Sequence, residues 1–188
     1  MIRTSADDAI GYIKKTMSGD VMNIKKIRVD KEGAGMGWGA VYAQYLESMD
    51  QISGQGNGLS VSRQLYKGDE ALNESAPLKV GDKITVRLTV KADRDMDFVQ
   101  IKDDRAACME PLQAVSGFCW SNGLGYYQAT KDASTQFFID QMRKGTYVIE
   151  YQVYVNRTGE YQVGIATVQS AYAPEFGGHT GGYRVMVE

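Results

Sequence analysis

The strongest constraint on the fold of this chain is a strict alternation of apolar and polar residues in two of its segments. Residues 84–91 read Ile-Thr-Val-Arg-Leu-Thr-Val-Lys, so every second side chain is apolar. Residues 147–155 place Tyr, Ile, Tyr, Val and Val on one face in the same way. Successive side chains of a β-strand point to opposite sides of a sheet. Both segments are therefore predicted to be strands with one face in a core and the other in water.

Other stretches rich in β-branched and aromatic residues also predict strands. Short spacings between these stretches, and only 3 prolines in the chain, favour antiparallel hairpins. The predicted fold is therefore all-β, an antiparallel sandwich without a long amphipathic helix. Residues 134–142 fit either a helical turn or a short strand. The further predicted strands are 22–29, 38–46, 59–66, 98–102, 160–166 and 183–187.

A glycine-rich stretch divides the chain into two unequal parts. Residues 49–58 have the composition of a linker, and we place the domain boundary between residues 55 and 56. Segment 1–55 is short for a self-standing core, so we expect it to lean on the following domain, 56–188, or on something larger.

Composition excludes several classes of partner. A net charge of -2 gives no basis for binding nucleic acid or an anionic membrane surface. No apolar stretch is long enough to span a bilayer, so this segment is not expected to insert into a membrane. The first eight residues carry two acids and no apolar run, unlike a secretory signal.

The sequence offers few candidates for a catalytic base, because His179 is the only histidine. No Gly-x-Ser-x-Gly elbow is present, and a cysteine nucleophile would need the same histidine as its base. The glycines of 176–182 precede a predicted strand, whereas a phosphate loop needs a following helix. We predict no catalytic residue and no cofactor. A small enzyme that uses His179 is the weaker alternative.

Metal binding is also poorly supported. Asp93, Asp95 and Asp97 resemble the start of a calcium loop, but the glycine and distal glutamate of an EF-hand are missing. The competing interpretation is a solvated acidic hairpin. A zinc site built on the cysteines and His179 would need carboxylates to complete it, so no metal is predicted.

The cysteines and the aromatic residues each leave two interpretations open. Cys108 and Cys119 are either free buried thiols or one disulfide, which closes a loop of about 12 residues worth roughly 3 kcal/mol. Trp120, Tyr126 and Tyr127 are either strand-face packing or a platform on which a sugar stacks. The second interpretation belongs to an alternative function, a free-standing carbohydrate-binding or adhesin sandwich.

An ordered series of short motifs resembles one known family. The motifs are residues 38–47 (WGAVYAQYLE), 81–87 (GDKITVR), 93–99 (DRDMDFV), 104–111 (DRAACMEP), 125–127 (GYY) with 131–132 (KD), 144–147 (KGTY) and 172–176 (YAPEF). In this order they resemble the C-terminal end of bacterial α2-macroglobulin-like proteins, particularly the Bacteroidetes type, from about residue 11 onward.

The resemblance implies an architecture and a role. Such proteins are very large, are secreted or anchored in the cell envelope, and trap proteases by changing conformation after a bait region is cut. Residues 1–55 would be the second half of a CUB-like domain, and 56–188 a terminal macroglobulin-type, Ig-like sandwich. The thioester motif Cys-Gly-Glu-Gln of the family is absent, since Cys108 precedes Met-Glu-Pro and Cys119 precedes Trp-Ser-Asn.

The chain is therefore expected to be a non-enzymatic structural or interaction domain. Its expected partners are other domains of the same larger chain and, indirectly, proteases. Its expected location is the cell envelope, the periplasm or the exterior, and such an oxidising location favours a Cys108–Cys119 disulfide. The candidate interaction or motif residues are Trp38, Arg105, Tyr126, Tyr127, Tyr172, Pro174, Glu175, Phe176 and His179.

Overall fold

The computed structural model describes residues 14–19, 26–42, 44–73 and 76–188. Contacts within the chain divide it into two compact units, Met1–Leu46 and Glu47–Glu188. We call the second unit the sandwich, and each unit is described by itself.

The described residues of the first unit form no strand. The predicted strands 22–29 and 38–46 are absent from their described residues, and their remaining residues lie outside the described part of the chain. Large apolar side chains are exposed here, with Trp38 and Tyr42 each at 91% and Leu46 at 104% of their full accessibility. A strand pair that buries no apolar face has little to stabilise it, which accounts for the missing strands.

The sandwich consists almost entirely of strands. The predicted strands that begin at residues 59, 84, 98, 147 and 183 are confirmed, residues 134–142 form a strand, and 160–166 divides between two strands. The elements are η2 (Met49–Gln51), β1 (Gln55–Asn57), β2 (Leu59–Lys67), β3 (Glu70–Ala71), β4 (Lys83–Ala92), β5 (Met96–Asp104), β6 (Met109–Pro111), β7 (Gly117–Ser121), β8 (Leu124–Thr130), β9 (Ser134–Met142), β10 (Gly145–Val155), β11 (Gly159–Val163), β12 (Ala166–Ser170), β13 (Gly177–His179) and β14 (Tyr183–Val187).

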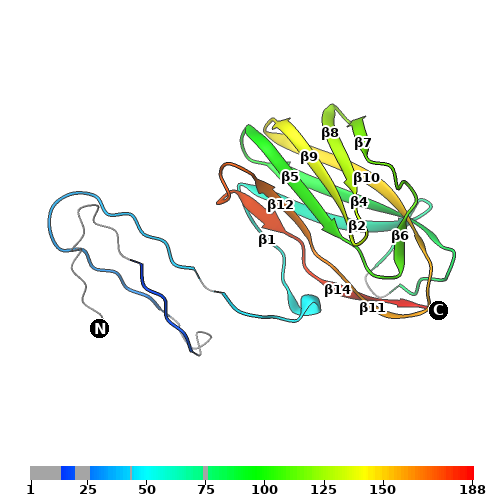
Figure 1. The fold of residues 1–188 in the computed structure, drawn as a ribbon, viewed down its shortest axis with the longest axis horizontal. Coiled ribbons are helices and arrows are strands. Elements are labelled where there is room, and N and C mark those ends of the chain that lie inside the picture. Colours follow the sequence, from blue (N-terminus) through cyan, green and yellow to red (C-terminus); the bar gives the residue numbers. More distant parts are fainter. Residues whose placement is uncertain (1–13, 20–25, 43, 74–75) are drawn as a thin grey trace. The chain divides into compact units, whose positions relative to one another are not determined.

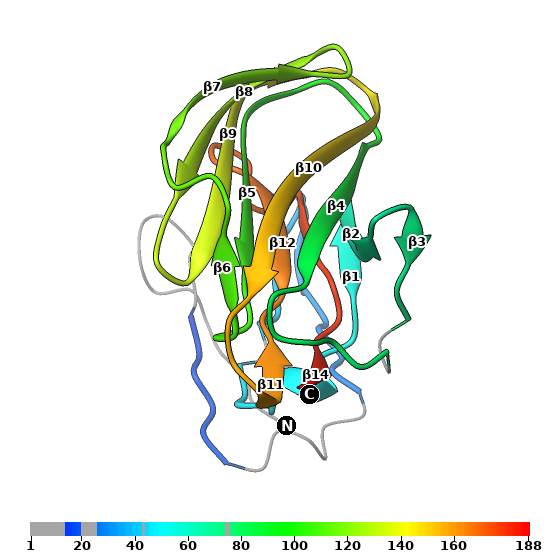
Figure 2. The ribbon, with the colours of Figure 1, turned by 90° about the vertical axis from the view of Figure 1, so that its right-hand side faces the viewer.

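The strands form two layers that face each other (Figures 1 and 2). One layer has the order β6-β10-β4-β2, with β3 beside β2, and the other has the order β12-β5-β9-β8-β7. Strands β1 and β13 connect the layers along one edge, so hydrogen bonds run through a single 12-stranded ladder. Strands β11 and β14 form a separate ribbon at one end. All of the strand pairs are antiparallel, which confirms the predicted fold class.

The core lies between the layers and follows from the alternation in the sequence. Every second residue of β4 is buried, and Leu88 and Val90 are fully inaccessible. An aromatic chain crosses the core, because the Phe137 ring lies 5.7 Å from that of Tyr126 and 5.9 Å from that of Tyr151. Strand alternation thus supplies the apolar faces, and these aromatic rings join the two layers.

The glycine-rich segments 49–58 and 176–182 are both close-packed, so the first of them is not the predicted linker. Strands β1 and β13 pair with each other. A Cβ atom on Gly178 would lie 2.7 Å from the carbonyl oxygen of Leu59, and one on Gly182 would lie 1.8 Å from that of Met49. Only glycine permits such close approach of one backbone to another.

The same packing places the start of the sandwich earlier than the predicted boundary between residues 55 and 56. The Gly182 amide donates to the Ile52 carbonyl at 3.0 Å. The Arg184 Nε atom lies 3.0 Å from Asp50 Oδ2. These contacts attach the chain from Glu47 onward to the C-terminal strands.

Replacing Gly178 by alanine is expected to lower the free energy of unfolding by about 1–3 kcal/mol, because the added methyl group would force backbones apart. Urea unfolding followed by circular dichroism measures this loss. Gly117→Ala is the matched control, since no atom lies within 4 Å of a Cβ at that position. Equal losses in the two variants would contradict the close-packing argument.

Candidate interaction surfaces

A buried ion pair joins the two layers of the sandwich. Arg63 on β2 and Asp103 on β5 approach to 2.5 Å between Nη1 and Oδ1, and their side chains are 3% and 1% exposed. The Tyr151 hydroxyl donates to Asp103 Oδ2 at 2.7 Å, and Arg63 Nη2 donates to the Gly164 carbonyl. Burial lowers the pKa of Arg63, but the charge of Asp103, two neighbouring tyrosines and the hydrogen bond to Asp103 together raise the pKa overall, so the guanidinium stays charged.

Tyr151 completes this network as a neutral donor. Burial and then the negative charge of Asp103 raise its pKa well above the usual range of tyrosine. The three side chains are satisfied by each other and by two backbone carbonyls, except for the buried Arg63 Nε atom. The network therefore fixes how the layers face each other and presents no reactive group to solvent.

Arg105, predicted as a motif residue, is also buried and serves as a structural donor. Its Nη1 atom donates to Thr135 Oγ1 at 2.6 Å, and its Nη2 atom donates to the carbonyls of Lys131 and Asp132 at 2.5 and 2.9 Å. These acceptors form the turn between β8 and β9. Arg105 thus holds a β-turn from within and does not lie on an interaction surface.

The three predicted platform aromatics do not share a face. Tyr126 points into the core at 6% exposure, whereas Trp120 is 78% and Tyr127 is 37% exposed. The Phe118 and Tyr127 rings pack edge to face, with 5.2 Å between centroids and an angle of 75°. The expectation of a joint platform of Trp120, Tyr126 and Tyr127 is therefore wrong for Tyr126, because neighbours on a strand point in opposite directions.

Tyr172, one of the predicted C-terminal motif residues, is 80% exposed. Its ring packs edge to face against Phe98, with 5.2 Å between centroids. Phe98 has a φ of 52°, a left-handed conformation that a phenylalanine rarely adopts. The Phe98 carbonyl accepts from the Ala171 amide at 2.9 Å, which ties this conformation to the motif.

The rest of that motif is anchored through its backbone. The carbonyls of Pro174 and Glu175 accept bonds from Gln169 and Asn57 at 3.2 and 2.8 Å. The Phe176 ring is half-buried, and the Arg94 guanidinium lies 4.6 Å from its centroid. The motif is a tightly folded connection between β12 and β13.

His179 and the two cysteines lie apart from any catalytic arrangement. His179 belongs to β13, and its Nδ1 atom lies 3.1 Å from the Thr180 carbonyl. Both Cys108 and Cys119 are free thiols, so the predicted disulfide is not formed. Cys108 is fully buried in the turn before β6, whereas Cys119 lies on β7, the strand at the other end of the sheet order. Burial raises the pKa of the Cys108 thiol, which disfavours the reactive thiolate.

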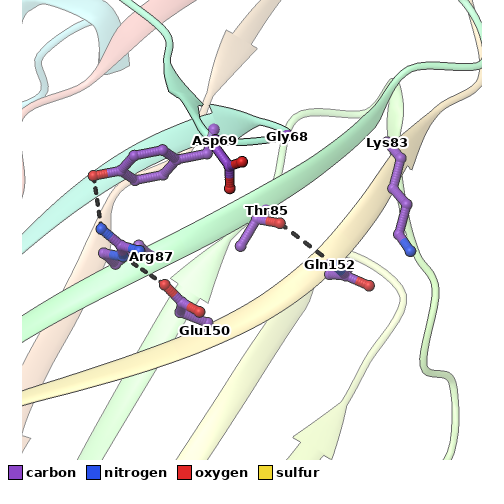
Figure 3. A pocket seen from close by; sticks show the side chains of 8 residues that line it. Gly68, Asp69, Lys83, Thr85, Arg87, Glu150 and Gln152 are labelled. Carbon is purple, nitrogen blue, oxygen red and sulfur yellow. Dashed lines mark hydrogen bonds and ion pairs between the residues drawn. The ribbon is translucent and has the colours of Figure 1, made fainter.

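An open groove of about 580 Å³ lies on the outer face of β2, β4 and β10 (Figure 3). Its charged centre is internally paired, since Arg87 Nε donates to Glu150 and Arg87 Nη1 donates to the Tyr66 hydroxyl at 2.9 Å. The guanidinium also stacks over the Tyr66 ring at 4.3 Å. The hydrogen bond to Glu150 raises the pKa of Arg87. Cross-strand pairing accounts for this cluster, because Glu150 is the register partner of Arg87 and Tyr66 lies diagonally opposite Arg87 on β2.

Neither a metal centre nor a membrane-spanning helix is found in the part of the chain that the structure describes. No group of three or more potential ligand side chains gathers there. In the acidic turn, Asp93 pairs with Arg94, and Asp95 accepts from the Lys144 amide at 2.7 Å. The described residues also contain no helix of the length and hydropathy that crossing a bilayer requires.

Neither the Arg63–Asp103 pair nor the exposed position of Phe118 was predicted from the sequence. A signal for the first was present, because Arg63 follows Leu59 and Val61 in the inward phase of β2. Asp103 follows Val99 and Ile101 in the same way. Charged residues in the buried phase of two strands indicate an internal pair.

The fold of the sandwich is similar to that of parts of solved bacterial α2-macroglobulins. It matches Salmonella α2-macroglobulin reacted with methylamine with a TM-score of 0.59 and 20% identity, over 72% of this chain and 10% of that one. It matches native Escherichia coli α2-macroglobulin, from domain MG7 to the C-terminus, with a TM-score of 0.61 and 17% identity, over 72% of this chain and 24% of that one. At these identities the likeness establishes the fold.

Two sequence comparisons extend this result. The chain is 28% identical over 142 residues to circularly permutated Ras protein 2 of Dictyostelium discoideum, which covers 70% of this chain and 4% of that protein. The chain thus spans only a small part of this relative. Residues 58–175 match the model of the bacterial α2-macroglobulin MG10 domain. This match covers more than half of the chain, which therefore belongs to the bacterial α2-macroglobulin MG10 domain family.

Proposed function

We propose that this chain is a non-enzymatic interaction domain at the C-terminal end of a much larger, protease-trapping α2-macroglobulin-like protein. The family match over residues 58–175 carries the proposal. Solved relatives include Escherichia coli α2-macroglobulin in a trypsin-activated form and in a form activated by porcine elastase. In this proposal the sandwich packs against sister domains and transmits their rearrangement after a protease has cut elsewhere.

The rigid connection between the two layers supports a role in transmission. Arg63, Asp103 and Tyr151 join the layers through buried, charge-assisted hydrogen bonds. A sandwich held in this way moves as one body, so force applied to one face reaches the other.

Exposed apolar side chains in the first unit support partners within a larger chain. Trp38, Tyr42 and Leu46 are each at least 91% exposed. Exposed apolar groups of this size are costly in water and mark surfaces that another element covers. We infer that this unit is part of a CUB-like domain whose remaining strands come from elsewhere in the same larger protein. The proposed location of that protein is the cell envelope, the periplasm or the exterior.

The native protein tests this proposal directly. An antibody raised against this chain, used on fractionated cells, is expected to detect a band many times larger than 20.8 kDa in the envelope fraction. The purified native protein, treated with trypsin, should block cleavage of a large protein substrate while cleavage of a small peptide substrate continues. A band at the size of this chain, or full activity of trypsin on the large substrate, would overturn the proposal.

A free-standing carbohydrate-binding sandwich is the second candidate. The observation in its favour is Trp120, which is 78% exposed and rests one ring face on Gly125. The buried Tyr126 and the perpendicular rings of Phe118 and Tyr127 weaken it, because sugar platforms need coplanar exposed rings. Binding on a glycan array that Trp120→Ala abolishes would favour this candidate.

A further inference from the structure

The hairpin of β7 and β8 is an uncharged surface on a charged protein. Residues 112–130 contain no Asp, Glu, Lys or Arg, although these residues make up 23% of the chain. Within this stretch Val115, Phe118 and Trp120 are 76%, 84% and 78% exposed. An exposed apolar surface without charges is typical of a surface that another molecule covers.

Strand β7 is also an open edge of the sheet, since it ends the strand order beside β8. Strand β6 ends the order on the other side, but it has only three residues, among them Glu110 and Pro111. Charges, prolines and short length are the usual devices that prevent an edge from pairing with another strand. The five residues of β7, Gly-Phe-Cys-Trp-Ser, include no charge and no proline.

The turn after β7 determines which backbone groups face outward. Asn122 and Gly123 have φ values of 51° and 78° and join Ser121 to Leu124 in a two-residue loop. Such a loop makes the flanking residues a hydrogen-bonded pair, and the pairs then alternate along the hairpin. The amides and carbonyls of Phe118 and Trp120 therefore point away from β8, toward the open edge.

This edge is complementary to itself. A two-fold axis at Cys119 would place Phe118 of one copy opposite Trp120 of a second copy, with Gly117 opposite Ser121. The outward amides and carbonyls of Phe118 and Trp120 would then bond to each other across the axis, and the two Cys119 residues would form the non-hydrogen-bonded pair. No like charges oppose each other in this register, because the edge carries none.

The exposed face of the sheet beside the edge carries a row of aromatic side chains that the same two-fold arrangement would extend. Phe118 pairs with Tyr127 and Tyr127 pairs with Phe138, so these three aromatic side chains form one cross-strand row. In the two-fold arrangement, Trp120 of the second copy extends this row. Aromatic side chains bury about 150–250 Å² each. Four from two copies would remove at most about 600–1,000 Å², which is below the roughly 1,200 Å² of a stable interface, so the dimer should be weak and concentration-dependent.

We propose that β7 is a pairing edge for a second copy of this chain, in which two β7 strands pair antiparallel about Cys119 and join the aromatic rows of both copies. The neutrality and near-palindromic pattern of the edge select a second copy over an unrelated strand. The perpendicular packing of Phe118 and Tyr127 argues against a sugar as the occupant. The proposal does not depend on the proposed function.

Sedimentation velocity of the full chain over a wide concentration range tests the pairing. The mass is expected to rise from 20.8 kDa toward twice that value. Trp120→Lys places charges at both Phe118–Trp120 pairs and should leave the chain monomeric. Trp38→Lys is the matched control, because Trp38 is 91% exposed but lies in the first unit. A chain that stays monomeric throughout, or a dimer that survives Trp120→Lys, would overturn the proposal.

Cysteine cross-linking tests the register. Diamide, a thiol oxidant, accepts two electrons and two protons from two thiols as they form a disulfide. At concentrations where the dimer forms, a cross-linked dimer should appear on a non-reducing gel. It should persist in Cys108→Ser, since Cys108 is fully buried, and disappear in Cys119→Ser. Cross-linking that depends on Cys108, or glycan binding by a monomeric chain that Trp120→Lys removes, would contradict pairing through β7.

Discussion

Replacing Asp103 by leucine is expected to lower the free energy of unfolding by about 3–5 kcal/mol, because the Arg63 guanidinium is left buried without a counter-charge. The Tyr151 hydroxyl loses its acceptor in the same variant. For a chain of this length, the loss corresponds to a fall in melting temperature of about 10 °C. Urea unfolding and calorimetry measure the two quantities.

The adjacent Asp104 provides a matched control for Asp103. Its ion pair with Lys102, at 2.9 Å, has side chains that are 30% and 43% exposed. Asp104→Leu should cost less than about 1 kcal/mol, because solvent screens an exposed pair. The double variant Arg63→Met, Asp103→Leu should recover much of the loss, since it removes both buried charges. If the two aspartates gave equal losses, the inter-layer pair would not be what stabilises the sandwich.

Arg105→Met is expected to lower the free energy of unfolding by about 2–4 kcal/mol, because three acceptors of the β8–β9 turn lose a charged donor. The affected acceptors are Thr135 Oγ1 and the carbonyls of Lys131 and Asp132. Urea unfolding measures the loss, and hydrogen exchange of residues 131–134 should accelerate in the folded protein. The unfolding measurement gives the loss of stability, and hydrogen exchange shows whether that loss is located in the turn.

Two further variants define the mechanism at Arg105. Arg105→Lys should fall between the wild type and Arg105→Met, because an ammonium group cannot reproduce the planar fork of the guanidinium. Arg157→Met, at an exposed position, should stay within about 0.5 kcal/mol of the wild type. A small effect in Arg105→Met would show that water replaces the guanidinium in the turn.

The strands of the sandwich could be predicted because half-buried strands leave a period-two signal. Residues 84–91 and 147–155 alternate as sequence, and they form β4 and β10, whose inward residues are buried. The same rule excludes a platform that contains both Tyr126 and Tyr127, since adjacent residues on a strand face opposite ways. The rule shows that the two tyrosines face opposite sides, and the structure shows that Tyr126 is the one in the core.

The glycine-rich segments could not be assigned from the sequence, for a physical reason. Glycine has no side chain, so it gives no alternation, and a flexible linker and a close-packed strand have the same composition. Gly56 in β1 and Gly178 in β13 became informative only when the structure showed which carbonyls lie next to them. The boundary of the sandwich depended on this distinction.

For the candidate site residues, too, some properties could be inferred from local sequence and others required the fold. The burial of Arg63 and Asp103 could be inferred from their phase in the strands, but their pairing spans 40 residues and requires the topology. The edge position of β7 likewise depends on the order of strands in the sheet, which no local pattern contains. Local sequence thus predicted which face a residue occupies, and only the fold showed its partner.

The ladder that closes through β1 and β13 has a consequence for how the protein is made. Strand β13, from Gly177 to His179, is paired on both sides, and the Leu78 amide bonds to the Met186 carbonyl at 2.9 Å. During synthesis these residues have not yet been made when β1 and β2 emerge from the ribosome. The early strands must therefore wait with open edges until the last strands are released, a period in which chaperones would be expected to bind them.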